Sequence, residues 1–153
     1  MKKLVVMLSA CLLISLMGYT QEIAPEKVPA PVKESFAKKF PAATDIKYEM
    51  EKKDYEVTFK NKGIGMSANF NSSGEWLETE TVMIESDLPK VVLTSVATNF
   101  VGFMITEITR LDGPNNVLNY EMILKKAKEG YEVKFSTTGD ILKKTPLKIP
   151  GKK

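Results

Sequence analysis

The sequence contains no histidine, and its 153 residues include only one cysteine and one tryptophan. Without histidine, the chain lacks the most common general base, the most common zinc ligand and the usual group that titrates near neutral pH. We also find no phosphate-binding glycine loop and no Gly-x-Ser-x-Gly motif. The chain therefore has no recognisable catalytic constellation, and we expect no enzymatic activity, no cofactor and no bound metal.

Residues 1–20 predict a secretory signal peptide. The basic start Met1–Lys3 precedes the apolar run Leu4–Met17, which is too short to span a bilayer comfortably. Leu8–Cys11 resembles a lipoprotein cleavage box, but the apolar run continues past Cys11, so a lipoprotein anchored through Cys11 is the less favoured alternative. The chain after this segment has no cysteine and forms no disulfide. Export without cysteine suits a bacterial envelope, so we expect a periplasmic or secreted protein.

The charge balance indicates neither nucleic acid nor an anionic membrane as a partner. The formal net charge is +3, and removal of Lys2 and Lys3 with the signal peptide leaves +1 (3 − 2). Hydrophobic residues make up 43% and charged residues 27% of the chain, as in a soluble globular protein that buries its own core. We expect no membrane span in the mature chain.

Two short amphipathic helices are predicted by apolar residues spaced four apart. The proline-containing segment 21–30 reads as an exposed lead-in. After it, Val32, Phe36 and Phe40 form one apolar stripe, which ends at Phe40 because the residue before proline is disfavoured in a helix. A similar stripe recurs 60 residues later at Val92, Val96 and Phe100.

Alternating apolar and polar residues predict antiparallel strands after each helix. The hairpin pattern of residues 65–78 recurs at residues 130–143, with a constant offset of 65. We therefore expect an α+β fold made of two α-β-β-β-β units, residues 31–85 and 86–145, followed by a basic tail at 146–153. Each unit would pack its helix on one face of its own four-stranded sheet. The apolar strand residues would face the two cores: Tyr55, Val57, Phe59, Tyr120, Met122, Leu124, Tyr131, Val133 and Phe135.

The motifs in this order resemble a known family. Residues 29–43 read Pro-x-x-Val-x-x-x-Phe-x-x-x-Phe-Pro-x-Ala, and Tyr-Glu-Val-x-Phe and Phe-x-x-x-Gly-Glu-Trp-Leu-Glu follow. Together they resemble the PepSY-like, β-lactamase-inhibitor-like periplasmic proteins common in the Bacteroidetes. The second unit departs from the pattern, with Val96 for the middle phenylalanine and Ile141 for tryptophan. The resemblance implies a pair of helix-on-sheet units and a role in binding or inhibiting another protein, with no catalytic residues.

The face of the sheets opposite the helices is the candidate partner-binding surface. Trp76 would be its aromatic anchor, since an exposed indole on a polar surface is typical of binding hot spots. The face on which the Trp76 side chain lies depends on the alternation along its strand. A bulge near Gly74 would turn Trp76 inward and Leu77 outward. Glu78 and Glu80 share this face, but no calcium-binding loop pattern surrounds them. The candidate residues are Trp76, Glu78, Glu80, Glu49, Glu56, Glu121, Glu132, Lys134 and Ile141.

The sequence favours an exported, non-enzymatic protein-binding module over two other classes of protein. Its partner would be an unidentified protein in the cell envelope or outside, and binding could sterically inhibit an envelope or secreted enzyme. The alternative is a periplasmic carrier or sensor of a peptide or small apolar ligand, which requires a cavity between the helices and sheets. An enzyme is least favoured. The sequence also allows a dimer in which edge strands of two copies pair with each other.

Overall fold

The computed structural model describes residues 20–148. The expected signal peptide, including Cys11, therefore lies outside the described residues except for Thr20. Within residues 20–148, nine antiparallel strands form a single sheet in which their order follows the chain. The strands are β1 Thr20–Ile23, β2 Ala43–Glu51, β3 Asp54–Asn61, β4 Ile64–Phe70, β5 Trp76–Val82, β6 Met104–Gly113, β7 Val117–Lys126, β8 Glu129–Ser136 and β9 Ile141–Pro146.

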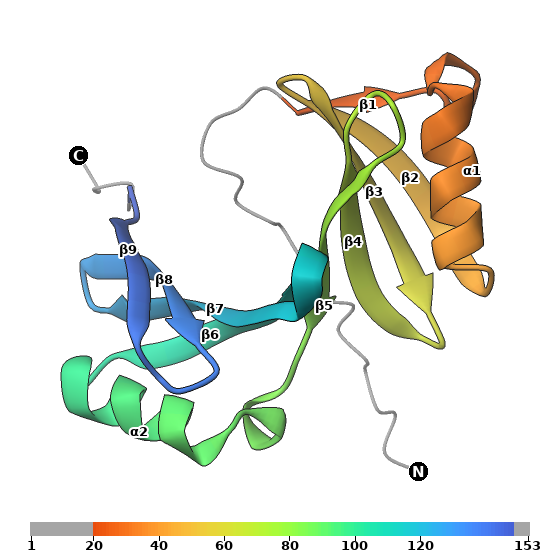
Figure 1. The fold of residues 1–153 in the computed structure, drawn as a ribbon. Coiled ribbons are helices and arrows are strands. Elements are labelled where there is room, and N and C mark those ends of the chain that lie inside the picture. Colours follow the sequence, from red (N-terminus) through yellow and green to blue (C-terminus); the bar gives the residue numbers. More distant parts are fainter. Residues whose placement is uncertain (1–19, 149–153) are drawn as a thin grey trace, which may run out of the picture.

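The prediction of two separate four-stranded sheets is wrong. Strands β5 and β6 pair with each other from Thr79↔Asp112 to Val82↔Thr109, which joins all the strands into one sheet (Figure 1). The physical reason is the cost of a sheet edge. Two separate sheets would each leave a row of backbone N–H and C=O groups unpaired at this junction, whereas the β5–β6 ladder satisfies them.

The segment 21–30 is more ordered than the exposed lead-in we expected. Residues Thr20–Ile23 form β1 and pair with β2, from Thr20↔Glu51 to Ile23↔Tyr48. The 3-10 turn η1 (Pro25–Lys27) then leads into the first helix. At the other end, β9 continues to Pro146, and its last pair joins Pro146 to Tyr131 of β8.

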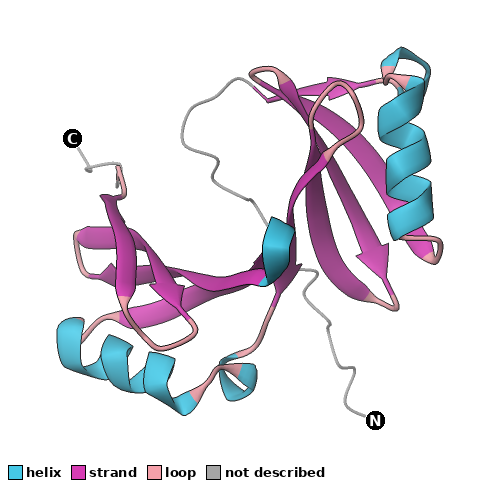
Figure 2. Ribbon diagram, in the orientation of Figure 1, coloured by secondary structure: helices cyan, strands magenta, loops and turns pink. Residues whose placement is uncertain are grey.

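Two α-helices cover one face of the sheet. They are α1 (Ala30–Lys39) and α2 (Lys90–Asn99), and the 3-10 turns η2 (Glu85–Asp87) and η3 (Pro114–Asn116) lie in connections. Figure 2 shows that strands dominate the described chain and that no helix lies over the opposite face of the sheet. We call that opposite surface the helix-free face.

Each helix buries its apolar stripe against its own part of the sheet. Phe36 of α1 is 2% exposed, and its ring centroid lies 5.0 Å from that of Phe59 in an edge-to-face contact. Under α2, Val92 and Phe135 are both fully buried. The nine residues predicted to face the cores all lie in these two clusters or pack against them, which confirms that part of the prediction.

Register shows that both cores lie on the same face of the sheet. Met66, which packs against the α1 core, pairs with Thr81, and Thr81 pairs with Arg110. Arg110 pairs in turn with Tyr120 of the α2 core. Residues paired directly across neighbouring strands point to the same side, so both helices lie on one side. The helix-free face therefore runs across the whole sheet.

Candidate functional site

Seven of the nine candidate residues lie on the helix-free face. The pairs Glu49↔Glu56, Glu56↔Asn69 and Asn69↔Glu78 place three of them on one face across β2 to β5, and Glu56 alternates along β3 with Tyr55 and Val57 of the α1 core. Glu121 pairs with Lys134 on β7 and β8. Strand alternation thus gave the correct face for Glu49, Glu56, Glu78, Glu80, Glu121, Glu132 and Lys134.

Trp76 lies on the helix-bearing face, so the prediction that it anchors the helix-free face is wrong. The register shifts between Asn69↔Glu78 and Phe70↔Trp76, which leaves Leu77 as the extra residue of a bulge. Trp76 therefore points to the same side as Phe70 and packs against the α1 core. Its Nε1–H donates a hydrogen bond of 2.8 Å to Thr79 Oγ1.

Ile141 is displaced from the predicted face for the same reason. It pairs with Phe135, a residue of the α2 core, while Lys143 pairs with Lys134 on the helix-free face. The shift between these pairs marks a second bulge, at Leu142. The predicted surface consequently loses both of its large apolar members and keeps its charged ones.

Four carboxylates gather near the middle of the helix-free face. We call Glu56, Glu78, Glu80 and Glu121 the carboxylate cluster; they come from β3, β5 and β7. Lys134 Nζ lies 4.0 Å from Glu78 Oε2, although β6 and β7 separate their strands in the sheet. Figure 1 shows the sheet bending between its two ends, with the helices on the outside of the bend. The cluster therefore lies on the concave side.

Burial, together with nearby negative charges, raises the pKa of three carboxyl groups in the cluster. The pKa of Glu80 rises to about 7, because burial disfavours its charge and the charges of Glu56, Glu121 and Glu78 add to the effect against the opposing Lys134. Burial is also the largest cause of the raised pKa of Glu56 and of Glu121. The cluster thus holds more negative charge than Lys134 offsets, and an added cation would stabilise its ionised form.

Ser67 adds a buried hydroxyl to this face. It is 2% exposed and pairs with Glu80, and it lies near enough to Glu56 to lower the pKa of that carboxyl. Within residues 20–148, however, no partner of Ser67 Oγ meets the usual distance and angle limits for a hydrogen bond. The contact with Glu56 is therefore weak, and the hydroxyl retains hydrogen-bonding capacity directed toward the cluster.

Replacement of Ser67 with alanine should leave the free energy of unfolding unchanged or raise it by up to about 1 kcal/mol, because it removes a buried hydroxyl that lacks a good partner. Urea unfolding at pH 7 measures this effect. Thr79→Val is the matched comparison: it removes the acceptor of the Trp76 N–H and should cost about 1–3 kcal/mol. If the free energy of unfolding of Ser67→Ala fell by more than about 1 kcal/mol, the Ser67 hydroxyl would be well hydrogen-bonded in solution.

The helix-bearing face carries a pocket that the sequence did not reveal. It has a volume of about 560 Å³ and lies between the end of α1, the strands β5 and β6, and η3. Of its lining residues, only Trp76 was among the candidate residues predicted from the sequence. The pocket's polar and aromatic walls include Lys39, Trp76, Thr79, Arg110, Asp112 and Asn116.

Two further observations concern metals and membranes. Within residues 20–148, no three histidine, cysteine, aspartate or glutamate side chains are arranged to hold a metal ion. No helix in this part of the chain has the length and apolar character needed to cross a membrane.

Several solved structures share this fold. A protein from Bacteroides eggerthii, described as "putative periplasmic", is 20% identical with a TM-score of 0.73, and the match covers 78% of this chain and 88% of that one. A DUF2874 family protein from Bacteroides uniformis is 20% identical with a TM-score of 0.73, over 77% of this chain and 88% of that one. A BLIP-like protein from Bacteroides fragilis is 22% identical with a TM-score of 0.70, over 82% and 91%. At these identities the likeness concerns the fold alone.

Comparison with protein families gave a match over most of the chain, whereas a search of curated proteins gave none. Residues 18–68 and 61–143 match the family described as "Putative beta-lactamase-inhibitor-like, PepSY-like". These segments overlap and together extend from residue 18 to residue 143. The chain therefore belongs to the β-lactamase-inhibitor-like, PepSY-like family.

Proposed function

We propose that this protein is an exported, non-enzymatic module that binds another protein through the helix-free face of its sheet. The observation that carries the proposal is the carboxylate cluster, which lies on the concave side of a sheet that no helix in residues 20–148 covers there. The partner would present lysine or arginine side chains to the cluster. The N-terminal sequence and the periplasmic description of the Bacteroides eggerthii protein support an envelope location.

The electrostatics of the cluster favour a cationic partner. Glu56 is 8% exposed, yet its carboxyl lies among the charges of Glu49 and Glu51, which raise its pKa further. An incoming ammonium or guanidinium group would relieve this repulsion and form charge-assisted hydrogen bonds. Complementary charge also accelerates the encounter of two proteins and rejects partners of the wrong sign.

Steric inhibition is the form of binding that the family description supports. A concave sheet face can cover a protruding loop of an enzyme without supplying any catalytic group. The chain has no histidine for general base catalysis. We therefore assign the face a blocking role, in which the bound partner's own active site becomes inaccessible.

The test is affinity capture from envelope extract of the source organism, with the purified protein as bait. Glu78→Lys combined with Glu121→Lys cancels the negative charge of the cluster and should lower partner retention at least tenfold. Glu26→Lys combined with Glu85→Lys is the matched control, since it makes the same change in net charge at exposed positions on η1 and η2. The control should retain the partner, and retention should fall as salt is raised.

Two outcomes would contradict the proposal. Equal retention by the cluster variant and the wild-type protein would place the binding surface elsewhere. Equal loss in the cluster variant and in the control would indicate a general charge effect rather than recognition by the helix-free face.

A further inference from the structure

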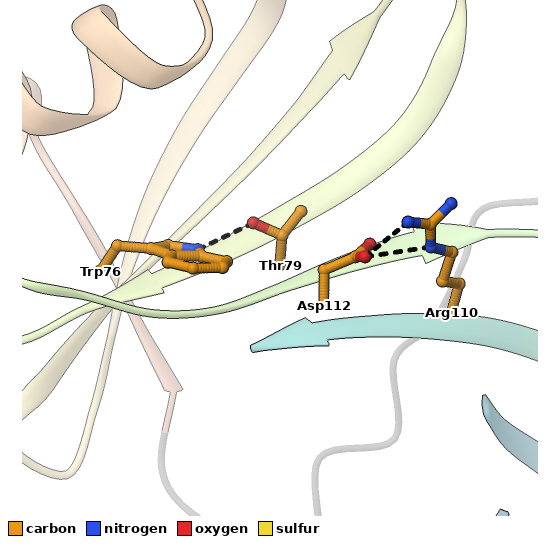
Figure 3. A network of polar contacts seen from close by, with 4 residues as sticks. All are labelled: Trp76, Thr79, Arg110 and Asp112. Carbon is orange, nitrogen blue, oxygen red and sulfur yellow. Dashed lines mark hydrogen bonds and ion pairs between the residues drawn. The ribbon is translucent and has the colours of Figure 1, made fainter. Parts of the chain in front are cut away.

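The pocket beside α1 has walls that are fixed before any ligand arrives. Its indole is held by the hydrogen bond from Trp76 Nε1 to Thr79 Oγ1, at 2.8 Å. Its guanidinium is held by Asp112, whose Oδ1 accepts hydrogen bonds from Arg110 Nε at 3.1 Å and Nη2 at 2.6 Å. Figure 3 shows these two pairs side by side along neighbouring strands. Because polar groups fixed in advance lose little conformational entropy on binding, such walls suit a small ligand.

Lys39 gives the pocket a cation without an acidic partner. Its ammonium lies 3.5 Å from the centroid of the Trp76 ring, and within residues 20–148 it makes no ion pair. Arg110 is largely neutralised by Asp112. The charged groups of the pocket therefore sum to +1 (two cations and one carboxylate), so the pocket favours a monoanion. A monoanion would neutralise this charge, whereas a dianion such as phosphate would leave a net charge of −1.

The turn η3 contributes neutral hydrogen-bonding groups at the rim. Asn115 and Asn116 have φ values of 58° and 59°, a left-handed conformation that asparagine tolerates better than most residues. Both line the pocket, and in the part of the chain described here neither side chain takes part in a hydrogen bond. Their amide groups can bond to an amide of a ligand, while Val117 and Leu118 supply apolar surface beside them.

We propose that this pocket is a second binding site, on the opposite side of the sheet from the carboxylate cluster, for a small carboxylate with an amide and an apolar body. The carboxylate binds Lys39 and the outer edge of Arg110. The amide faces the asparagines of η3, and the apolar body rests against Val117 and Leu118. The volume of about 560 Å³ is in the range of small-molecule sites, and an N-acylated amino acid has this chemistry.

The site can be tested by fluorescence because Trp76 is the only tryptophan in the chain. The probes are N-acetyl-leucine and its neutral amide, N-acetyl-leucinamide, titrated to about 10 mM against the purified protein. We expect a saturable change in emission, and an affinity for the carboxylate at least about tenfold higher than for the amide, since one charge-assisted hydrogen bond separates the two probes. Line broadening of the probes in NMR spectra provides a second readout that does not depend on the indole.

Lys39→Met retains the apolar stem over the indole and removes the charge. It should lower the affinity for N-acetyl-leucine about tenfold, to that for the amide. Lys38→Met is the matched control, since Lys38 is also exposed in the last turn of α1 but does not line the pocket. The proposal is overturned by an absence of saturable binding in both readouts, by equal affinities for the two probes, or by equal losses in both variants. These titrations involve no protein partner, so they are independent of the capture experiment.

Discussion

Replacement of Glu80 with glutamine should stabilise the protein by up to about 3 kcal/mol at pH 8 and leave its stability almost unchanged near pH 4.5. The folded-state pKa of about 7 lies about 2.5 pH units above the ordinary value of 4.5, and each unit corresponds to about 1.36 kcal/mol. Glutamine retains the size of the side chain and removes the buried charge. The gain should therefore come from relief of burial and of repulsion by Glu56, Glu121 and Glu78.

The sign of the pH dependence follows from linkage. A carboxyl group with a raised pKa binds its proton more tightly in the folded protein than in the unfolded chain, so ionisation favours unfolding. The contribution of Glu80 to the free energy of unfolding should be most favourable below about pH 4.5. It should decline as the pH rises to about 7 and stay constant above that. In the folded protein Glu80 faces Glu56 on β3, Glu78 on β5, Glu121 on β7 and Lys134 on β8, so these groups titrate together with it.

Urea unfolding of both proteins between pH 4.5 and pH 8 measures this difference. Glu26→Gln, at an exposed position on η1, serves as control and should change stability by less than about 0.5 kcal/mol at every pH. If the Glu80→Gln difference does not grow between pH 4.5 and pH 7, the side chain is better solvated or better paired than the structure indicates.

Replacement of Gly74 with alanine should lower the free energy of unfolding by about 3 kcal/mol or more. Gly74 has a φ of +81°, and a Cβ atom there would lie 2.4 Å from the carbonyl oxygen of Pro31 in the first turn of α1. The left-handed conformation costs an L-residue about 1–2 kcal/mol, and the clash adds strain of about 1–3 kcal/mol because a backbone atom cannot rotate away. The new methyl group would push α1 off the sheet or open the turn.

Gly63→Ala separates the conformational cost from the clash. Gly63 has a φ of +82°, but no heavy atom outside the adjoining residues lies within 4 Å of the position that an alanine methyl group would take there, so only the conformational cost of about 1–2 kcal/mol applies. The difference between the two variants in urea unfolding should therefore be about 2 kcal/mol. Equal losses would mean that α1 shifts at no cost and that the contact between this turn and the helix does not stabilise the protein.

Local patterns in the sequence were sufficient for the helices and for most strand faces. The spacing of Val32, Phe36 and Phe40 depends only on the helical repeat, and all three are buried. Away from the bulges at Leu77 and Leu142, alternation also assigned the core side of the strands correctly, because residues two apart on a strand share a face. These features are set by neighbours in the chain, which is why a single sequence suffices to find them.

The errors arose where a local pattern leaves two choices open. In Glu75-Trp76-Leu77 two apolar residues are adjacent, and alternation does not say which of them is the extra residue of a bulge. The β5–β6 ladder pairs residues 79–82 with residues 109–112, across the whole of α2, so no turn signal specifies it. The pocket depends on this ladder, because Trp76 and Thr79 come from one side of it and Arg110 and Asp112 from the other. The pocket could therefore not be predicted from the sequence.

The order of the strands in the sheet has a consequence for the rate of folding. Every strand pairs with the strand that precedes it in the chain, so most ladders close loops of only a few residues. The exceptions are β1–β2, whose connection contains η1 and α1, and β5–β6, whose connection contains η2 and α2. Short loop closures cost little entropy, and a low mean sequence separation of contacts speeds folding. We expect the hairpins to form early and these two ladders to close later, so substitutions in the β5–β6 ladder should accelerate unfolding more than they slow folding.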